Sequence, residues 1–316
     1  MRVPLYDLIA IGACNVDIFT TVSDAAPLLE VGAERAVAGD VDEFLRGMAS
    51  RGVEPLHVGG GGQAANVAAA VAGSGCRVAL VTRVGNDANA QLALSDLCGV
   101  DLTYVVRGGS TPRALVFIGA VGQRTIVLDS PNELNPPLLM PPVDAARHVH
   151  FTSMVETADL RAQIMFRRRL PPDVTTSVDG GRLYADLGID AVEAVTAEAT
   201  FVFAEQELGI LYRSNAREAE ERLFDLGVRF VCRKTGPEGA ALTSHDGAVL
   251  KSHPAKVDPV DTTGAGDVLA GVFLTCFLRR LPLEACLDKA VRAATTSVTG
   301  WGRTRYPGSL SMAIAG

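Results

Sequence analysis

Segments that mark a membrane or exported protein are absent from the sequence. No apolar run reaches the roughly eighteen residues that a spanning helix needs, and the N-terminus lacks a basic region followed by an apolar core and a cleavage site. Basic residues are also scarce, because 29 Lys and Arg stand against 36 Asp and Glu and give a formal net charge of -7. This balance argues against nucleic acid or an anionic membrane as the main partner. We expect a cytoplasmic protein that binds neither.

Patterns that mark disulfide scaffolds, metal sites and P-loops are absent too. None of the six cysteines forms a C-x-x-C pair, and most lie in apolar runs, as small core residues do in a reducing compartment. His148 and His150 would point to the same side of one strand, but no third ligand is evident nearby, which favours ordinary strand histidines over a metal site. No segment reads G-x-x-x-x-G-K-S/T, so a phosphate would have to be held by another loop.

A turn of small residues stands in front of a long apolar helix near the C-terminus. The stretch from Asp261 to Asp267 reads D-T-T-G-A-G-D, and apolar residues recur at helical spacing after it. Gly264, Ala265 and Gly266 leave their N–H groups unobstructed at the helix N-terminus, where a partial positive charge favours a phosphate. Asp267 would repel that anion unless it takes a proton from an approaching group. The alternative is a first-turn carboxylate that only complements the helix dipole.

A second glycine-rich stretch lies far earlier in the chain. Gly61 and Gly62 precede a small-residue helix that carries Asn66. Glycines let a ligand lie against the backbone, and an asparagine amide can donate and accept at once.

The same stretch satisfies the dinucleotide fingerprint G-x-G-x-x-A through Gly59, Gly61 and Ala64. However, the segment before it contains Pro55, and no acidic residue closes the next predicted strand. An NAD(P)-binding oxidoreductase is therefore the less favoured alternative.

Together the two stretches resemble the signatures of the ribokinase-like, or PfkB-type, carbohydrate kinases. D-T-T-G-A-G-D matches the C-terminal signature without a gap, and G-G-Q-A-A-N-V-A from Gly61, followed by R-V-G-N-D from Arg83, is similar to the second signature. The resemblance implies an ATP-dependent kinase that phosphorylates a hydroxyl, preferentially a primary one, of a sugar, nucleoside or related polyol. It implies Asp267 as general base, with the amides of Gly264, Ala265 and Gly266 stabilising developing charge and Mg²⁺ bridging the phosphates.

The remaining site residues also follow from this resemblance. Asp17 is expected to accept from substrate hydroxyls, together with Gly61, Gly62 and Asn66. By sequence alone a solvated strand-edge carboxylate is the favoured interpretation of Asp17, and only the resemblance overturns it. The nucleotide would contact Lys234, Gly236, Gly239 and Thr263. Glu207 would order Mg²⁺ through water, and the backbone of Asp261 would help to hold a monovalent cation such as K⁺. The segment Gly300 to Arg303 would border the adenine, although Trp301 could instead be a surface-packing residue.

Two positions depart from the family pattern, and a third bears on specificity. Ala204 replaces the asparagine of N-x-x-E, which weakens the expected magnesium network and leaves a non-catalytic sugar- or nucleotide-binding protein of the same fold as an alternative. Lys234 replaces a small hydroxyl residue, and either reaches a phosphate oxygen or is solvated on the surface. Gln63 lies where family members that act on phosphorylated sugars tend to carry lysine, and it has no charge to offer a phosphate.

Alternating strand and helix patterns predict an α/β fold with a doubly wound, mostly parallel sheet flanked by helices. A half-exposed strand is expected at Asn15 to Thr21, and a hairpin near 114–128 interrupts the alternation. In the family these two parts form a small β lid that excludes water from the transfer site. We expect residues 1–316 to form a single ribokinase-like domain, with the lid formed by about 15–40 and 110–130 and able to mediate a homodimer.

Overall fold

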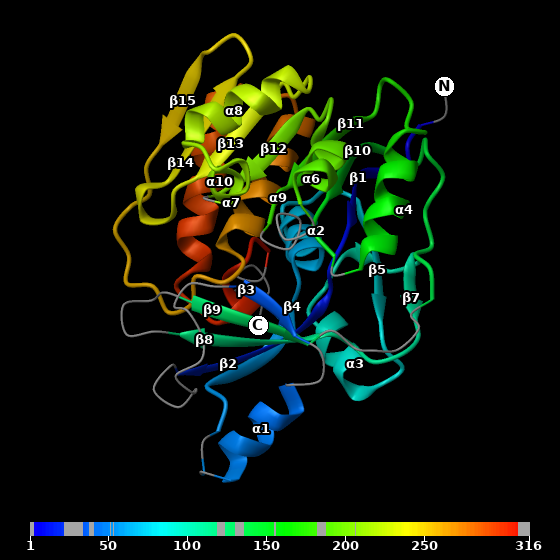
Figure 1. The fold of residues 1–316 in the computed structure, drawn as a ribbon, viewed down its shortest axis with the longest axis vertical. Helices are drawn as coiled ribbons and strands as arrows, with labels where there is room; N and C mark the ends of the chain where they lie inside the picture. The colour runs from blue at the N-terminus through cyan, green and yellow to red at the C-terminus, as the bar shows by residue number, and fades with distance from the viewer. Residues whose placement is uncertain are drawn as a thin grey trace.

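The computed structural model describes residues 3–21, 34–37, 41–50, 52, 54–118, 124–129, 136–154, 156–181, 188–205 and 207–308. These residues form a large sheet flanked by helices and a separate small sheet (Figure 1). The strand order of the large sheet is β15-β14-β13-β12-β11-β10-β1-β5-β6, with β7 paired to β5. The predicted doubly wound, mostly parallel sheet is confirmed.

The strands of the large sheet match the apolar runs of the sequence. They are β1 (Tyr6–Ile11), β5 (Val78–Val84), β6 (Val100–Asp101), β7 (Val105–Arg107), β10 (Ala146–Phe151), β11 (Thr175–Asp179), β12 (Phe201–Ala204), β13 (Phe230–Lys234), β14 (Ala240–Ser244) and β15 (Val249–Ser252). All neighbouring pairs are parallel except β13 with β14 and β14 with β15.

Two hydrophobic cores cover the two faces of the large sheet. Along β1, Leu8 and Ala10 belong to one core, whereas Ile9 and Ile11 belong to the other. Successive side chains of a strand point to opposite faces, so a strand with helices on both sides buries residues on both faces. This explains the apolar runs 8–11, 78–81 and Phe201–Ala204, whereas β10 and β11 also bury polar residues such as His148, His150 and Ser177.

The helices divide between these cores. One core contains residues of α2 (Gln63–Gly73), α3 (Ala88–Leu94), α9 (Ala265–Leu278) and α10 (Leu283–Ser297). The other contains residues of α4 (Thr157–Arg167), α6 (Ile189–Thr196), α7 (Glu207–Tyr212) and α8 (Ala216–Asp225). Helix α9 is buried along nearly its whole length, because its own residues are apolar on every side of the helix.

Close packing of α2 against α9 brings the two glycine-rich stretches together. A Cβ added to Gly271 would lie 2.9 Å from the Cβ of Ala70 and 3.0 Å from the carbonyl oxygen of Val67. Only a glycine lets the two helix backbones approach so closely. The first turns of α2 and α9 consequently face the same space.

The small sheet has the order β3-β9-β8-β2-β4. Its strands are β2 (Asn15–Thr21), β3 (Glu34–Val37), β4 (His57–Gly61), β8 (Arg113–Ile118) and β9 (Arg124–Asp129), and α1 (Val41–Ser50) packs beside β8 and β9 (Figure 1). The pairing of β8 with β9 is antiparallel, as expected of the predicted hairpin. Strand β4, which lies outside the ranges expected for the lid, also belongs to this sheet.

In this region one expectation from the sequence is wrong, and one disfavoured alternative is ruled out. Strand β2 is buried at every position except Thr21, and not half-exposed, because it lies between β8 and β4 and packs on both faces. Strand β4 pairs antiparallel with β2 in the small sheet, whereas a dinucleotide fingerprint must follow a strand of the parallel sheet. The glycines from Gly59 therefore do not form an NAD(P) loop.

Within the described ranges, no helix has both the length and the apolar character needed to span a bilayer.

Candidate active site

The strand order of the large sheet reverses its winding direction at the carboxyl end of β1, which is the expected place of a ligand crevice. From β1 the chain goes to α2 and β5 on one side, and β10 lies on the other side. Parallel sheets bind ligands outside the carboxyl ends of their strands where the winding direction reverses. Ser153 follows β10, Asp179 ends β11 and Lys234 ends β13, so polar side chains gather at this edge.

Asp267 lies in the first turn of α9 and is buried. The helix begins after Gly264, whose φ of 75° places it in the left-handed region. A Cβ there would overlap the hydroxyl of the buried Tyr306, so this position requires glycine for its backbone and for its packing. The Nδ2 of Asn66 donates a hydrogen bond of 2.8 Å to Oδ2 of Asp267. The structure thus joins the two predicted motifs through one direct contact.

Asn66 is already engaged at both ends of its amide. Its Oδ1 accepts from Nε of Arg303 at 2.9 Å while Nδ2 donates to Asp267. The second N–H of its NH₂ group and the second lone pair of Oδ1 are the positions at which Asn66 could still meet a substrate. Arg303 was expected only as the end of a segment that borders the adenine, and its contact with Asn66 was not predicted, because nothing in its spacing marks it.

Asp17 is buried in β2 and is not a solvated strand-edge residue, so that alternative is wrong. Asn15 donates from Nδ2 to its Oδ1 at 2.6 Å. A Cβ at Gly61 would overlap the carboxylate, which means that Asp17 lies directly against the backbone of β4. Gly62 also has a structural task, since it precedes α2 with a φ of 96° and a Cβ there would overlap Cys14 and the carbonyl of Ala13.

Gln63 faces the loops that follow β10 and β11. Ser153 donates from its hydroxyl to Oε1 of Gln63 at 2.6 Å. A Cβ on Gly181 would lie 3.0 Å from Nε2 of Gln63, so the amide nitrogen points toward this loop. Gln63 therefore presents a neutral N–H group at the crevice.

Lys234 lies beside the glycine turn and is not solvated, which rules out the surface alternative. Its side chain is 9% exposed, and its Nζ is 2.9 Å from Oδ2 of Asp179, a side chain that is 1% exposed. Glu205 lies 3.6 Å from the same ammonium group. A Cβ on Gly266 would be 2.9 Å from Nζ, so the positive charge adjoins the backbone that precedes Asp267.

Asp261 is committed to the backbone around it. Its Oδ1 accepts from the N–H of Thr263 at 2.8 Å and its Oδ2 accepts from the N–H of Gly302 at 3.0 Å. The predicted contact of the Asp261 backbone to a monovalent cation is not tested by these bonds.

The predicted nucleotide loop is a tight turn between β13 and β14. The N–H and the hydroxyl of Thr235 both donate to the carbonyl of Gly239 at 2.9 Å. Gly236 and Gly239 have φ values of 58° and 100°, which favour glycine. Ala204 is the buried last residue of β12, and Glu207 begins α7. The side chain of Glu207 lies outside the described residues, so its expected magnesium contact is not tested.

The strand histidines are neutral hydrogen-bonding residues. His148 bonds with the hydroxyls of Thr175 and Ser177, and His150 with that of Ser177, each at 2.7 Å. Burial lowers the pKa of His148 well below its usual value, and burial together with the charge of Lys234 lowers the pKa of His150 to about 3. In the part of the chain that the structure describes, no group of three His, Cys, Asp or Glu residues could hold a metal.

Trp301 packs against the small sheet. Its ring stacks on that of His57 in β4, with centroids 5.8 Å apart, and meets Phe19 of β2 edge-on at 5.5 Å. The segment that follows α10 therefore contacts two strands of the lid.

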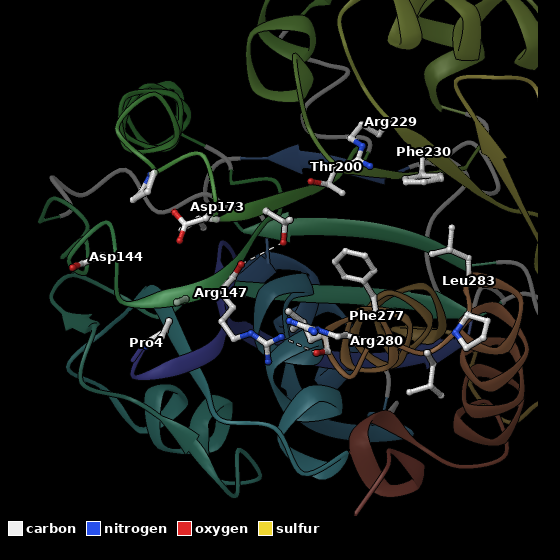
Figure 2. Close-up of a pocket in the computed structure, with 17 residues that line it drawn as sticks. Pro4, Asp144, Arg147, Asp173, Thr200, Arg229, Phe230, Phe277, Arg280 and Leu283 are labelled. Atoms are coloured by element: carbon white, nitrogen blue, oxygen red, sulfur yellow. Dashed lines mark hydrogen bonds between the residues drawn. The ribbon is translucent and has the colours of Figure 1, made fainter. Parts of the chain in front are cut away.

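A cavity of about 1030 Å³ lies at the opposite, amino end of the parallel strands (Figure 2). Ala146, Thr175 and Phe230 line it at the starts of β10, β11 and β13, and the residues around Arg280, beyond the C-terminus of α9, complete it. None of the predicted site residues lines this cavity, so it is separate from the crevice.

Fold and geometry together define a class of α/β protein in which a glycine-rich turn before a helix N-terminus, of the kind that suits an anion, lies near a separate small sheet. Comparison with known proteins identifies the family within that class. The pattern of the pfkB family carbohydrate kinases matches residues 31–305, and the chain belongs to this family. It is accordingly a carbohydrate or nucleoside kinase.

Relatives within the family differ in their substrates. An ATP-dependent ribose-1-phosphate kinase from Halopiger xanaduensis is 35% identical over 239 residues, which cover 73% of this chain and 77% of the relative. Adenosine kinase from Sinorhizobium meliloti superposes with a TM-score of 0.80 at 23% identity, covering 99% of this chain and 100% of its own. Arabidopsis thaliana ribokinase, complexed with ribose and ATP, gives a TM-score of 0.73 at 24% identity over 98% of each chain.

Proposed function

We propose that this protein transfers the γ-phosphoryl group of ATP to a primary hydroxyl of a sugar, nucleoside or related polyol, with Asp267 as general base. The observation that carries the proposal is the position of Asp267. It is a buried carboxylate in the first turn of α9, directly after Gly264, Ala265 and Gly266 and held by Asn66. A carboxylate among anion-binding amides is useful when it removes a proton from the group that attacks the phosphate.

The reaction follows from this geometry. Asp17 accepts from hydroxyls of the substrate and orients it, while Asp267 takes the proton of the attacking hydroxyl. A bond forms between that oxygen and the γ-phosphorus as the bond to the leaving ADP oxygen breaks. The amides of Gly264, Ala265 and Gly266, with the ammonium group of Lys234 beside them, stabilise the charge on the transferring group. The proton leaves Asp267 once the product has dissociated.

ATP fits the donor groups present at the site. Backbone N–H groups at the start of α9 suit phosphates, and we propose Lys234, Gly236, Gly239 and Thr263 as further nucleotide contacts. Mg²⁺ would bridge the phosphates and neutralise their charge, with Glu207 as its water-mediated ligand. A monovalent cation such as K⁺ would bind backbone oxygens near Asp261.

The substrate pocket favours a polyol without a phosphate. Gln63 and Ser153 are neutral and hydrogen-bonded to each other, so these two side chains offer no cation to a sugar phosphate. The similarity to a ribose-1-phosphate kinase supports a second candidate, a phosphorylated pentose. We propose the unphosphorylated class first, because the contact between Gln63 and Ser153 belongs to this chain.

The test is ADP release from the purified protein with ATP, Mg²⁺ and K⁺. The panel contains ribose, deoxyribose, ribose 1-phosphate, adenosine, cytidine, other sugars and sugar acids, with an Asp267→Ala variant in parallel. ADP release that requires one of these compounds and is lost in the variant supports the proposal and names the substrate class. ATP binding without turnover for every compound would favour the alternative of a binding protein, to which the loss of asparagine at Ala204 points.

We also propose that residues 1–316 act as one ribokinase-like domain and that two copies associate through the small sheet. Sedimentation velocity at several concentrations tests the association. A monomer at the concentration used for activity would contradict it and leave the kinase assignment unaffected.

A further inference from the structure

We propose that Arg303 is a positioning residue, which fixes the orientation of the Asn66 amide and through it the carboxylate of Asp267. This inference rests on the proposed role of Asp267 as base. Arg303 lies in the 3-10 turn Gly302–Arg305 and its side chain is 3% exposed.

The guanidinium of Arg303 joins several elements around the site. Its Nε donates to Oδ1 of Asn66 in α2 at 2.9 Å, and its Nη2 donates to the carbonyl of Gly61 in β4 at 2.8 Å. Its Nη1 donates to the carbonyl of Ala93 in α3 at 3.2 Å and forms an ion pair with Asp96. All three nitrogens are therefore occupied by acceptors from separate parts of the chain.

The chemistry of the guanidinium determines which way Asn66 faces. Arginine has five N–H donors and no acceptor, so the atom of Asn66 that meets Nε must be the carbonyl oxygen. The NH₂ group then points to Asp267 and donates to Oδ2. With the amide reversed, its oxygen would face the carboxylate of Asp267, and two acceptors would repel each other. Arg303 thus keeps the donor on the side of the base.

The glycine run of β4 makes room for this arrangement. A Cβ on Gly60 would lie close to Nη1 of Arg303 and 2.9 Å from the carbonyl oxygen of Ala93. Gly60 has no predicted contact with substrate, whereas Gly61 lies against Asp17. The need to seat a guanidinium accounts for a glycine that substrate binding does not explain.

Stability alone is a weak reason for such a group. A guanidinium at 3% exposure loses most of its hydration, while its carboxylate partner Asp96 is 39% exposed and screened by water. Buried charges are seldom retained for stability, since apolar residues of similar size often serve as well. Fixing a catalytic neighbour is a task that an apolar residue cannot perform.

A double-mutant cycle on kcat tests the inference. We expect Arg303→Gln to lower kcat on the order of 100-fold, because a small misplacement of the base is costly, with KM for ATP nearly unchanged. If Arg303 acts through Asn66, the double variant Arg303→Gln/Asn66→Ala has the same kcat as Asn66→Ala within about twofold. Losses that multiply in the double variant would overturn the inference.

Two further variants separate positioning from folding. Arg167→Gln is the matched control. Arg167 is the last residue of α4, and its guanidinium donates to the carbonyl of Val195 in α6, so kcat should not change. Arg303→Lys keeps a cation beside Asp96 but lacks the planar fork, so it should unfold near the wild-type temperature and still show reduced kcat. A wild-type kcat in Arg303→Lys would show that charge alone is needed and would overturn the positioning role.

Failure of the proposed function is distinguishable from failure of this inference. If the wild-type protein transfers no phosphoryl group to any compound, the proposed function has failed. The positioning role is then decided by a crystal structure of Arg303→Gln. The inference holds if the Asn66 amide has left Oδ2 of Asp267, and it is wrong if the 2.8 Å contact persists.

Discussion

The two ends of the large sheet both carry charged side chains, but these charges are held in different ways. At the carboxyl end, Asp17, Asp267 and Lys234 are buried and each has a defined partner. At the amino end, Arg147 and Arg280 are exposed around an apolar floor that includes Phe277 (Figure 2). The burial and fixed geometry of charged groups therefore indicate more about the chemistry of a site than the volume of a cavity does.

The largest effect on stability is expected at Lys234. Lys234→Met leaves the carboxylate of Asp179 buried without its ammonium partner, and should lower the free energy of unfolding by about 3 to 5 kcal/mol. Denaturation with urea measures this change. Removing both charges in Lys234→Met/Asp179→Leu should recover most of the loss, and no recovery would mean that the pair is not the cause.

Asp17 is expected to affect substrate use more than folding. Asp17→Asn loses a charged acceptor for hydroxyls and should lower kcat/KM for the acceptor substrate by about 10- to 100-fold, while KM for ATP stays the same. Asp173→Asn is the matched control, because Asp173 is an exposed carboxylate at the amino-end cavity. Equal losses of kcat/KM in both variants would contradict a functional difference between the two ends of the sheet.

A smaller and pH-dependent effect is expected at His150, which lies in β10 between the two ends. Its pKa of about 3 in the folded protein is below the value of about 6.5 in an unfolded chain. The unfolded state then binds a proton first, so the stability contribution is present above about pH 6.5 and is lost as the pH falls toward 3. We expect His150→Gln to lose less stability than the wild type between pH 7 and pH 5. If urea denaturation shows the same loss of unfolding free energy between pH 7 and pH 5 in both proteins, this prediction is wrong.

The smallest effect is expected at the amino end. Arg280 has a φ of 63°, a left-handed conformation that is costly for any residue with a Cβ. Arg280→Gly should raise the free energy of unfolding by about 1 kcal/mol and leave kcat unchanged, since the cavity takes no part in transfer. Arg280→Ala keeps the Cβ and should give no such gain. A loss of activity in either variant would show that this end is functional.

Motifs that act through the backbone could be located from the sequence. The anion-binding turn at Gly264 and the start of α2 after Gly62 depend on glycine, and glycine is visible in a sequence. The apolar periods likewise placed the strands of the parallel sheet. The joining of β4 to the small sheet could not be predicted, because its glycines carry no pattern of alternation.

Contacts between side chains that are far apart in the sequence could not be predicted. Arg303 contacts Asn66 only after the 3-10 turn Gly302–Arg305 has packed against α2 and β4, and a lone arginine gives no local signal in the sequence. Asp179 and Ser153 could have been found, since each stands at or just after the carboxyl end of a predicted strand of a parallel sheet. The burial of β2 was predicted wrongly because alternation of polar and apolar residues normally indicates one solvent-exposed face, whereas Asn15 and Asp17 are buried and hydrogen-bonded to each other.

Trp301 gives the chain a built-in optical reporter. It is the single tryptophan, and its ring rests on His57 and Phe19 from two strands of the small sheet. Its emission is therefore sensitive to any displacement of these strands, without a label and without background from another indole. Movement of the lid on addition of nucleotide or acceptor can be followed in a fluorimeter before the physiological substrate is known.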